Sequence, residues 1–272
     1  MINSDETIPG SVQVKLDRAR EHVGHLTEAV RNYVRDELSV RRQVESDGRE
    51  HVFFWETYSA PPPRLGLVIG DAVHNLRSAL DHLVVSLAKE GAQRSGTMLS
   101  VEDEHRLQYP IFTSETKFNQ KRARYLKFVP ESMVEYIRGR QPFTIASASH
   151  VHFLARIHEL DNTDKHRQIN VPVMLRRDLL TDWPPEIECT VVDRNTTPQV
   201  GAELTRFVFR TPQEARNVPI QLTFSVQLPG PGSVQSADYV LSSYIDNVEA
   251  LIRDIVTGAV AVGSLIMPNE DS

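Results

Sequence analysis

The feature that most constrains the fold is the segment Arg64–Glu90, RLGLVIGDAVHNLRSALDHLVVSLAKE, which predicts a long helix with two unlike faces. At about 100° per residue, its apolar positions fall within one arc that would face a core. That arc holds Ala72, Val73, Leu76, Ala79, Leu80, Leu83, Val84 and Leu87. We therefore expect this helix to be central to a helical bundle.

The opposite arc is polar, but it lacks the Lys, Glu and Gln that are typical of a solvated helix face. It holds Asp71, His74, Asn75, Arg77, Ser78, Asp81 and His82. Imidazoles, carboxylates and a guanidinium are groups that transfer protons or hold anions. We interpret this arc as the candidate functional site, and the alternative is a buried polar network that joins helices.

A second polar cluster, DNTDKHR, follows an apolar helix predicted near residues 150–160. Its candidate residues are Asn162, Asp164, Lys165, His166 and Arg167. One explanation is a helix C-terminus, where cations complement the dipole and Asp or Asn forms a turn. The other is a site shared with the first cluster, in which His166 is catalytic and the Asn, Asp and Lys side chains support it.

The chain as a whole predicts an α+β fold. At 272 residues, of which 40% are apolar, it is long enough to bury a sizeable core as one domain, residues 1–272. Periodicity predicts a helical core at about 12–38, 64–90, 116–161 and 238–263, and β segments at about 50–58 and 186–228. The range 116–161 is expected to hold three helices, at about 116–128, 130–138 and 150–160. The expected architecture is a helical bundle formed from both ends of the chain, with a small antiparallel sheet. Period-two segments at 187–192, 203–210 and 220–228 are expected to form an antiparallel meander.

Two local features refine this architecture. Gly91 is expected to end the long helix as its C-cap. Residues 92–116 are expected to form a loop that Tyr109–Phe112 anchors by apolar contacts.

Composition limits the class of protein. No apolar run approaches the roughly 18 residues of a membrane span, and the first residues show no secretion signal. The single cysteine, Cys189, excludes an internal disulfide and a multi-cysteine zinc site. We therefore expect a cytoplasmic protein that does not bind a membrane.

Charge is distributed unevenly along the chain. The net charge of −6 argues against a general nucleic-acid coat. The stretch KFNQKRARYLK nevertheless has five cations and no acid, with aromatic residues between them. It could hold phosphates and stack a base, or it could be a solvated helix face. The candidate RNA-binding residues are Lys117, Lys121, Arg122, Arg124 and Lys127.

Other catalytic chemistries have weaker support in the sequence. His74 and His82 lie two turns apart, about 12 Å of helical rise, which is too far for one metal ion unless other helices supply ligands. The chain has no G-x-S-x-G motif and no glycine-rich phosphate loop. No metal or other cofactor is therefore expected.

The stretch from Arg77 to His82, RSALDH, resembles the R-x4–6-H signature of the HEPN superfamily, whose nucleases occur in toxin–antitoxin and phage-defence systems. This resemblance implies metal-independent RNA cleavage in a homodimer, with an antitoxin-type protein as a possible partner. His82 would be the acid/base and Arg77 the phosphate clamp. The strings GDAVHNLRSALDH and NTDKHR also resemble an uncharacterised bacterial protein family, which implies no activity.

Three functions therefore remain as expectations. The first is a HEPN-like protein that cleaves or binds RNA. The second is a non-catalytic binding or regulatory module, whose polar helix face is structural or holds a small ligand. The third is a metal-dependent hydrolase. Because Arg77 and His82 both lie on the polar arc, their removal is expected to spare the fold.

Overall fold

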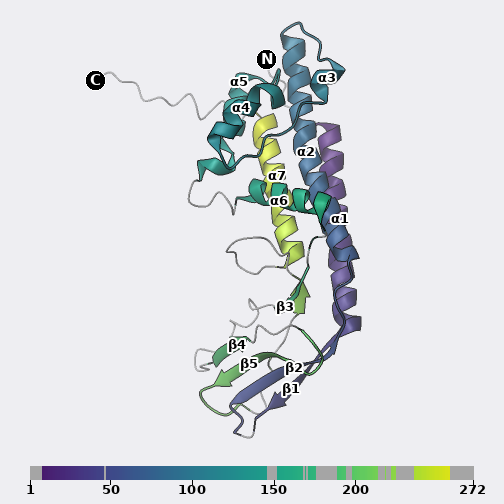
Figure 1. Ribbon diagram of the computed structural model, residues 1–272, viewed down its shortest axis with the longest axis vertical. Helices are drawn as coiled ribbons and strands as arrows, with labels where there is room; N and C mark the ends of the chain where they lie inside the picture. Colours follow the sequence, from purple (N-terminus) through teal and green to yellow (C-terminus); the bar gives the residue numbers. More distant parts are fainter. Residues whose placement is uncertain are drawn as a thin grey trace, which may run out of the picture.

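The protein has an α+β fold in which a helical bundle carries a small antiparallel sheet at one end (Figure 1). The computed structural model describes residues 8–45, 47–145, 152–167, 169, 171–175, 189–193, 198–213, 218, 222–224 and 236–257. The helices are α1 (Gly10–Glu37), α2 (Arg64–Arg94), α3 (Val101–Glu104), α4 (Glu115–Tyr125), α5 (Glu131–Gly139), the 3₁₀ helix η1 (Pro142–Thr144), α6 (Phe153–His166) and α7 (Ala237–Val256). The strands are β1 (Leu38–Val44), β2 (Glu50–Tyr58), β3 (Val173–Leu175), β4 (Cys189–Asp193), β5 (Glu203–Phe209) and β6 (Leu222–Phe224).

Helix α2 is central to the bundle, as its apolar arc predicts. It packs along α1 and also contacts α6 and α7. Seven of the eight arc residues are buried, and the eighth, Leu87, is half-buried. Burial of a Val or Leu side chain contributes about 1.5–3 kcal/mol, so this arc supplies much of the stability of the bundle.

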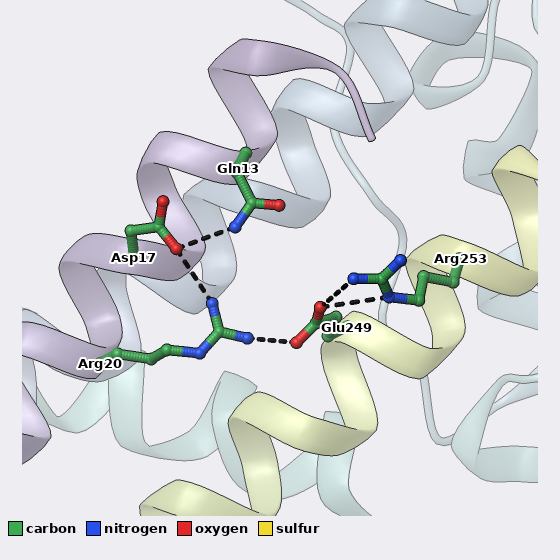
Figure 2. Close-up of polar contacts among 5 residues, drawn as sticks. All are labelled: Gln13, Asp17, Arg20, Glu249 and Arg253. Carbon is green, nitrogen blue, oxygen red and sulfur yellow. Dashed lines mark hydrogen bonds and ion pairs between the residues drawn. The ribbon is translucent and has the colours of Figure 1, made fainter. Parts of the chain in front are cut away.

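Helix α7 brings the C-terminal part of the chain back onto α1, which confirms a bundle built from both ends. Its buried face consists of Ala237, Leu241, Tyr244, Ile245, Val248, Leu251, Ile252 and Ile255. Beside this face, Arg20 of α1 donates to Asp17 at 3.0 Å and forms an ion pair with Glu249 of α7 (Figure 2). Arg253 donates to the same Glu249 at 2.6 Å. Such partly exposed pairs contribute about 1 kcal/mol or less, so the apolar face holds α7 in place.

The main sheet has the strand order β1-β2-β5-β4, with every pair antiparallel. Strand β2 confirms the aromatic segment predicted at residues 50–58. The helix expected at about 12–38 is confirmed as α1, but strand β1, which follows it directly, was not predicted. The segment LSVRRQV pairs with the neighbouring β2, from Leu38 opposite Tyr58 to Val44 opposite His51.

The later strands differ in part from the meander that the sequence predicts. Strands β4 and β5 are antiparallel neighbours, as expected. Strand β6 pairs with β3 in a separate two-stranded sheet, so it does not continue the meander. Period-two patterning identifies a strand but not its partner, because pairing is set by long-range contacts.

The end of α2 corrects the role expected for Gly91. The helix continues through Gly91 to Arg94, and the residue with positive φ beyond its end is Gly96, at 65°. Gly91 serves a different purpose, because a Cβ there would overlap the backbone carbonyl oxygen of Phe128. Its missing side chain lets the segment after α4 lie directly against α2.

The remaining helices differ from the predictions mainly at their ends. Helix α6 continues to His166, so the DNTDKHR cluster occupies its last turns and not a loop. The short helix α3 lies within the expected loop 92–116. Helix α7 is described to Val256, and the predicted extension over residues 258–263 lies outside the described residues. None of the described helices is both long and apolar enough to cross a membrane.

Candidate functional site

The crossing of α6 over α2 brings the two predicted polar clusters together (Figure 1). Gly70 has no side chain, and the carboxylate of Asp164 lies directly over it, in the space that a Cβ would fill. One turn further along α2, His74 Nδ1 lies 3.4 Å from Asp161 Oδ1. The other oxygen of Asp161 accepts a hydrogen bond from Lys165 Nζ at 2.5 Å. Asp161 thus links His74 of α2 to Lys165 of α6.

Exposure differs sharply within this group. The side chain of Asp161 is 4% exposed, whereas that of His74 is 58% exposed and Lys165 is also exposed. Burying a carboxylate is costly unless it is paired, and His74 and Lys165 supply the partners of Asp161. The geometry therefore fixes Asp161 and presents His74 to solvent.

Several carboxylates crowd this crossing. Partial burial raises the pKa of Asp164, and the nearby charges of Asp71 and Asp161 raise it further. Helix α1 adds the buried His22, whose pKa is lowered first by burial and then by Arg18, while Asp71 acts in the opposite direction. The site is therefore a polar junction of α1, α2 and α6 with an excess of acid.

Replacing Asp164 by asparagine is expected to raise the free energy of unfolding at pH 7 by up to about 1 kcal/mol. Because the folded-state pKa of Asp164 is raised, its charge opposes folding above that pKa, and stability is gained as the pH falls through it. The Asp164→Asn variant should therefore gain less stability than the wild type as the pH falls. Denaturant unfolding between pH 7 and pH 4 measures the effect. A variant less stable than the wild type at pH 7 would contradict it.

Arg77 and Asp81 bind the backbone of the segment that follows α3. Arg77 Nη2 donates to the carbonyl oxygen of Tyr109 at 2.6 Å and lies 3.1 Å from Asp81 Oδ1. The same Asp81 oxygen accepts the N–H of Tyr109 at 2.8 Å. Arg77 and Asp81 thus satisfy both backbone polar groups of one buried residue.

Gln141 fastens the same segment from its other side. This buried amide donates to the carbonyl of Pro110 at 2.8 Å and accepts from the N–H of Phe112 at 3.0 Å. The apolar anchor expected at Tyr109–Phe112 is therefore held by hydrogen bonds as well as by apolar contacts.

The environment of Arg77 does not leave it open to a ligand. Its side chain is only 11% exposed. Its Nη1 and the hydroxyl of Tyr109 are buried with no hydrogen-bond partner in the described part of the chain. Burial raises the pKa of Asp81, while Arg77 lowers it. A phosphate at Nη2 would have to displace Asp81 or the Tyr109 carbonyl, and the unpartnered Nη1 is buried away from solvent.

The other predicted catalytic residues are placed separately. His82 is half-buried and His166 is exposed. Within the residues that the structure describes, no hydrogen bond or ion pair joins either side chain to Arg77 or to the other.

The other supporting residues have local roles. Asn75 is buried and donates to the carbonyl of Asp71 at 2.8 Å. Ser78 is half-buried. Asn162 is exposed, with its Nδ2 3.1 Å from Nε2 of His158.

The basic segment divides into paired and unpaired cations. Arg122 lies 3.0 Å from Glu131 and 3.4 Å from Glu135, and Lys127 lies 2.8 Å from Asp103. The remaining three cations are exposed and have no ion-pair partner among the described residues. They are Lys117, Lys121 and Arg124. We call these three residues the α4 stripe.

The spacing of the α4 stripe places its members on one side of the helix. Positions i, i+4 and i+7 fall within about 60° of each other around a helix axis. The rise from Lys117 to Arg124 is about 10 Å. The stripe is thus a single short row of positive charge.

Sequence reasoning missed several residues of these sites. Asp161 could have been recognised as an i, i+4 partner of Lys165. The pairing of Tyr109 with Arg77 could not, because the two are 32 positions apart and joined through backbone atoms. The contact between Gly70 and Asp164 could not be predicted either, because no local sequence pattern indicates it.

In the described ranges, no three His, Cys, Asp or Glu side chains form a group that could hold a metal ion. The metal-dependent hydrolase therefore has no candidate site among these residues. No family model, curated protein or solved structure matches this chain.

Proposed function

We propose that this chain is an RNA-binding protein and that the α4 stripe is its contact to the phosphate backbone. The observation that carries the proposal is the exposure of Lys117, Lys121 and Arg124 in one row without acidic partners among the described residues. Phosphate contacts from Lys and Arg supply most of the affinity of non-specific nucleic-acid binding. The resemblance of RSALDH to the HEPN signature supports RNA as the ligand.

The charge at the α2–α6 crossing supports the choice of α4. Four aspartates lie on the facing helices there, against one arginine and one lysine. The aspartates are Asp71, Asp81, Asp161 and Asp164. Such an acidic excess repels phosphate, so an RNA strand gains more by contacting α4.

The hydrogen bond and ion pair of Arg77 favour RNA binding over RNA cleavage as the function. A clamp must meet the charge that develops on the phosphate with donors that are free to do so. The Nη2 of Arg77 is engaged by Tyr109 and Asp81, and its unpartnered Nη1 is buried away from solvent. Cleavage through Arg77 and His82 therefore stays the alternative, and loss of RNA integrity during incubation with chelator would favour it.

Replacing Lys117, Lys121 and Arg124 together by glutamine is expected to weaken RNA binding by about tenfold or more. The measurement is fluorescence anisotropy of a labelled RNA with the full chain at 100 mM salt. The control replaces Lys15, Arg31 and Arg64, which lie on α1 and α2, and so removes the same charge elsewhere. Equal losses in the two triple variants would contradict a site on α4.

A further inference from the structure

We infer that the RNA bound at the α4 stripe is single-stranded, with an unpaired base stacked on Tyr125. This inference rests on the proposed RNA-binding function. Tyr125 follows Lys121 by four residues, which places it about 40° away around the helix axis. Its ring is therefore on the flank of the stripe, and its side chain is half-buried and not enclosed.

The ring of Tyr125 is held in place by a second aromatic residue. It lies parallel to Phe112, with an interplanar angle of 8° and ring centroids 6.3 Å apart. Phe112 is itself fixed by the hydrogen bond from its N–H to Gln141. A ring fixed in this way loses little conformational freedom when a base stacks on it.

A row of cations next to an aromatic ring is the combination that binds single strands. The phosphates follow the charged row while a base stacks on the ring. In a duplex the bases are paired and stacked with each other, so none can reach Tyr125. The stripe is also a single row, which fits one phosphate backbone.

The side of α4 beyond Tyr125 does not extend the positive surface. There the guanidinium of Arg122 forms ion pairs with Glu131 and Glu135 of α5. Both glutamates are exposed, so a second phosphate strand on that side would meet carboxylates. Like-charge contacts of this kind discriminate against the wrong ligand.

The test compares a labelled 12-nucleotide RNA without self-complementarity and the same sequence annealed to its complement. The full chain is expected to bind the single strand at least about tenfold more tightly. Tyr125→Leu should weaken binding of the single strand about tenfold and leave duplex binding unchanged. Tyr125→Trp keeps an aromatic face and should bind the single strand as tightly as the wild type.

The outcomes separate this inference from the proposed function. Equal affinity for both RNAs, or equal losses with Tyr125→Leu, would overturn the single-strand inference while the α4 stripe could still bind RNA. An unchanged affinity of the Lys117, Lys121 and Arg124 triple variant for both RNAs would overturn the proposed function itself. If Tyr125→Leu lowers the melting temperature, the variants Tyr125→Trp and Phe112→Leu decide the question. The inference is overturned if Tyr125→Trp loses affinity for the single strand. It is also overturned if Phe112→Leu keeps the full affinity for the single strand.

Discussion

Replacing Arg77 by alanine is expected to lower the free energy of unfolding by about 2–4 kcal/mol, because a mostly buried, charge-assisted hydrogen bond is removed. The change leaves Asp81 without its cation and the carbonyl of Tyr109 without its donor. Tyr109 is fully buried, so water cannot replace the lost donor there, whereas Asp81 is partly exposed and is resolvated in part. Chemical denaturation followed by circular dichroism measures the loss.

His82→Ala is the matched control for Arg77→Ala, since it lies on the same polar arc of α2. Its side chain has no hydrogen bond or ion pair in the described part of the chain, so we expect a loss of less than about 1 kcal/mol. If Arg77→Ala is as stable as the wild type, Arg77 does not hold the Tyr109 segment. Loss of an RNA-cleaving activity in both variants without loss of stability would instead support the nuclease reading.

Replacing Gly91 by alanine is expected to cost about 2–3 kcal/mol, because the new methyl group would overlap a backbone atom. That atom is the carbonyl oxygen of Phe128, which cannot rotate away as a side chain can. Phe128 already has a positive φ of 66°, so its backbone has little room to adjust. Thermal and denaturant unfolding both report this change.

Gly24→Ala provides the contrast, because Gly24 is also inside a helix. Nothing lies within 4 Å of the Cβ that would be added there. Its replacement should therefore raise stability by about 0.5–1 kcal/mol through helix propensity alone. Similar effects of the two substitutions would show that Phe128 does not approach α2 closely enough to exclude a methyl group.

Much of the helical architecture is predictable because it follows from local periodicity. The apolar arc of α2 identifies its buried face, and Pro61–Pro63 mark where the helix begins. The face of α7 is predictable in the same way. These predictions succeed because a helix buries whatever its 3.6-residue period brings to one side.

The failures share a physical cause, which is contact between distant parts of the chain. Strand β1 forms because Leu38–Val44 finds a partner in β2, although its own residues give no clear strand pattern. The pattern of β6 does predict a strand, but its partner β3, which lies far back in the sequence, could not be predicted. Gly91 resembles a helix end locally, but its role is set by Phe128.

The candidate site was only partly accessible from sequence. The polar arc of α2 and the DNTDKHR cluster do meet, through His74 and Asp161. The role of Arg77 was not accessible, since a residue on a polar arc can face either solvent or another segment. Its contacts with Tyr109 and Asp81 correct the expectation that its removal spares the fold. Ion pairing separates Arg122 and Lys127 from the α4 stripe, and the sequence does not show this pairing because only the fold brings their acidic partners near.

The central claim, that the α4 stripe contacts RNA phosphates, is tested most directly by the salt dependence of binding. Each phosphate contact to a single strand contributes about 0.7 to the slope of log affinity against log salt concentration. Replacing Lys117, Lys121 and Arg124 by glutamine should therefore reduce the magnitude of the slope by about 2. The Lys15, Arg31 and Arg64 variant should keep the wild-type slope. An unchanged slope in the α4 variant would contradict the account.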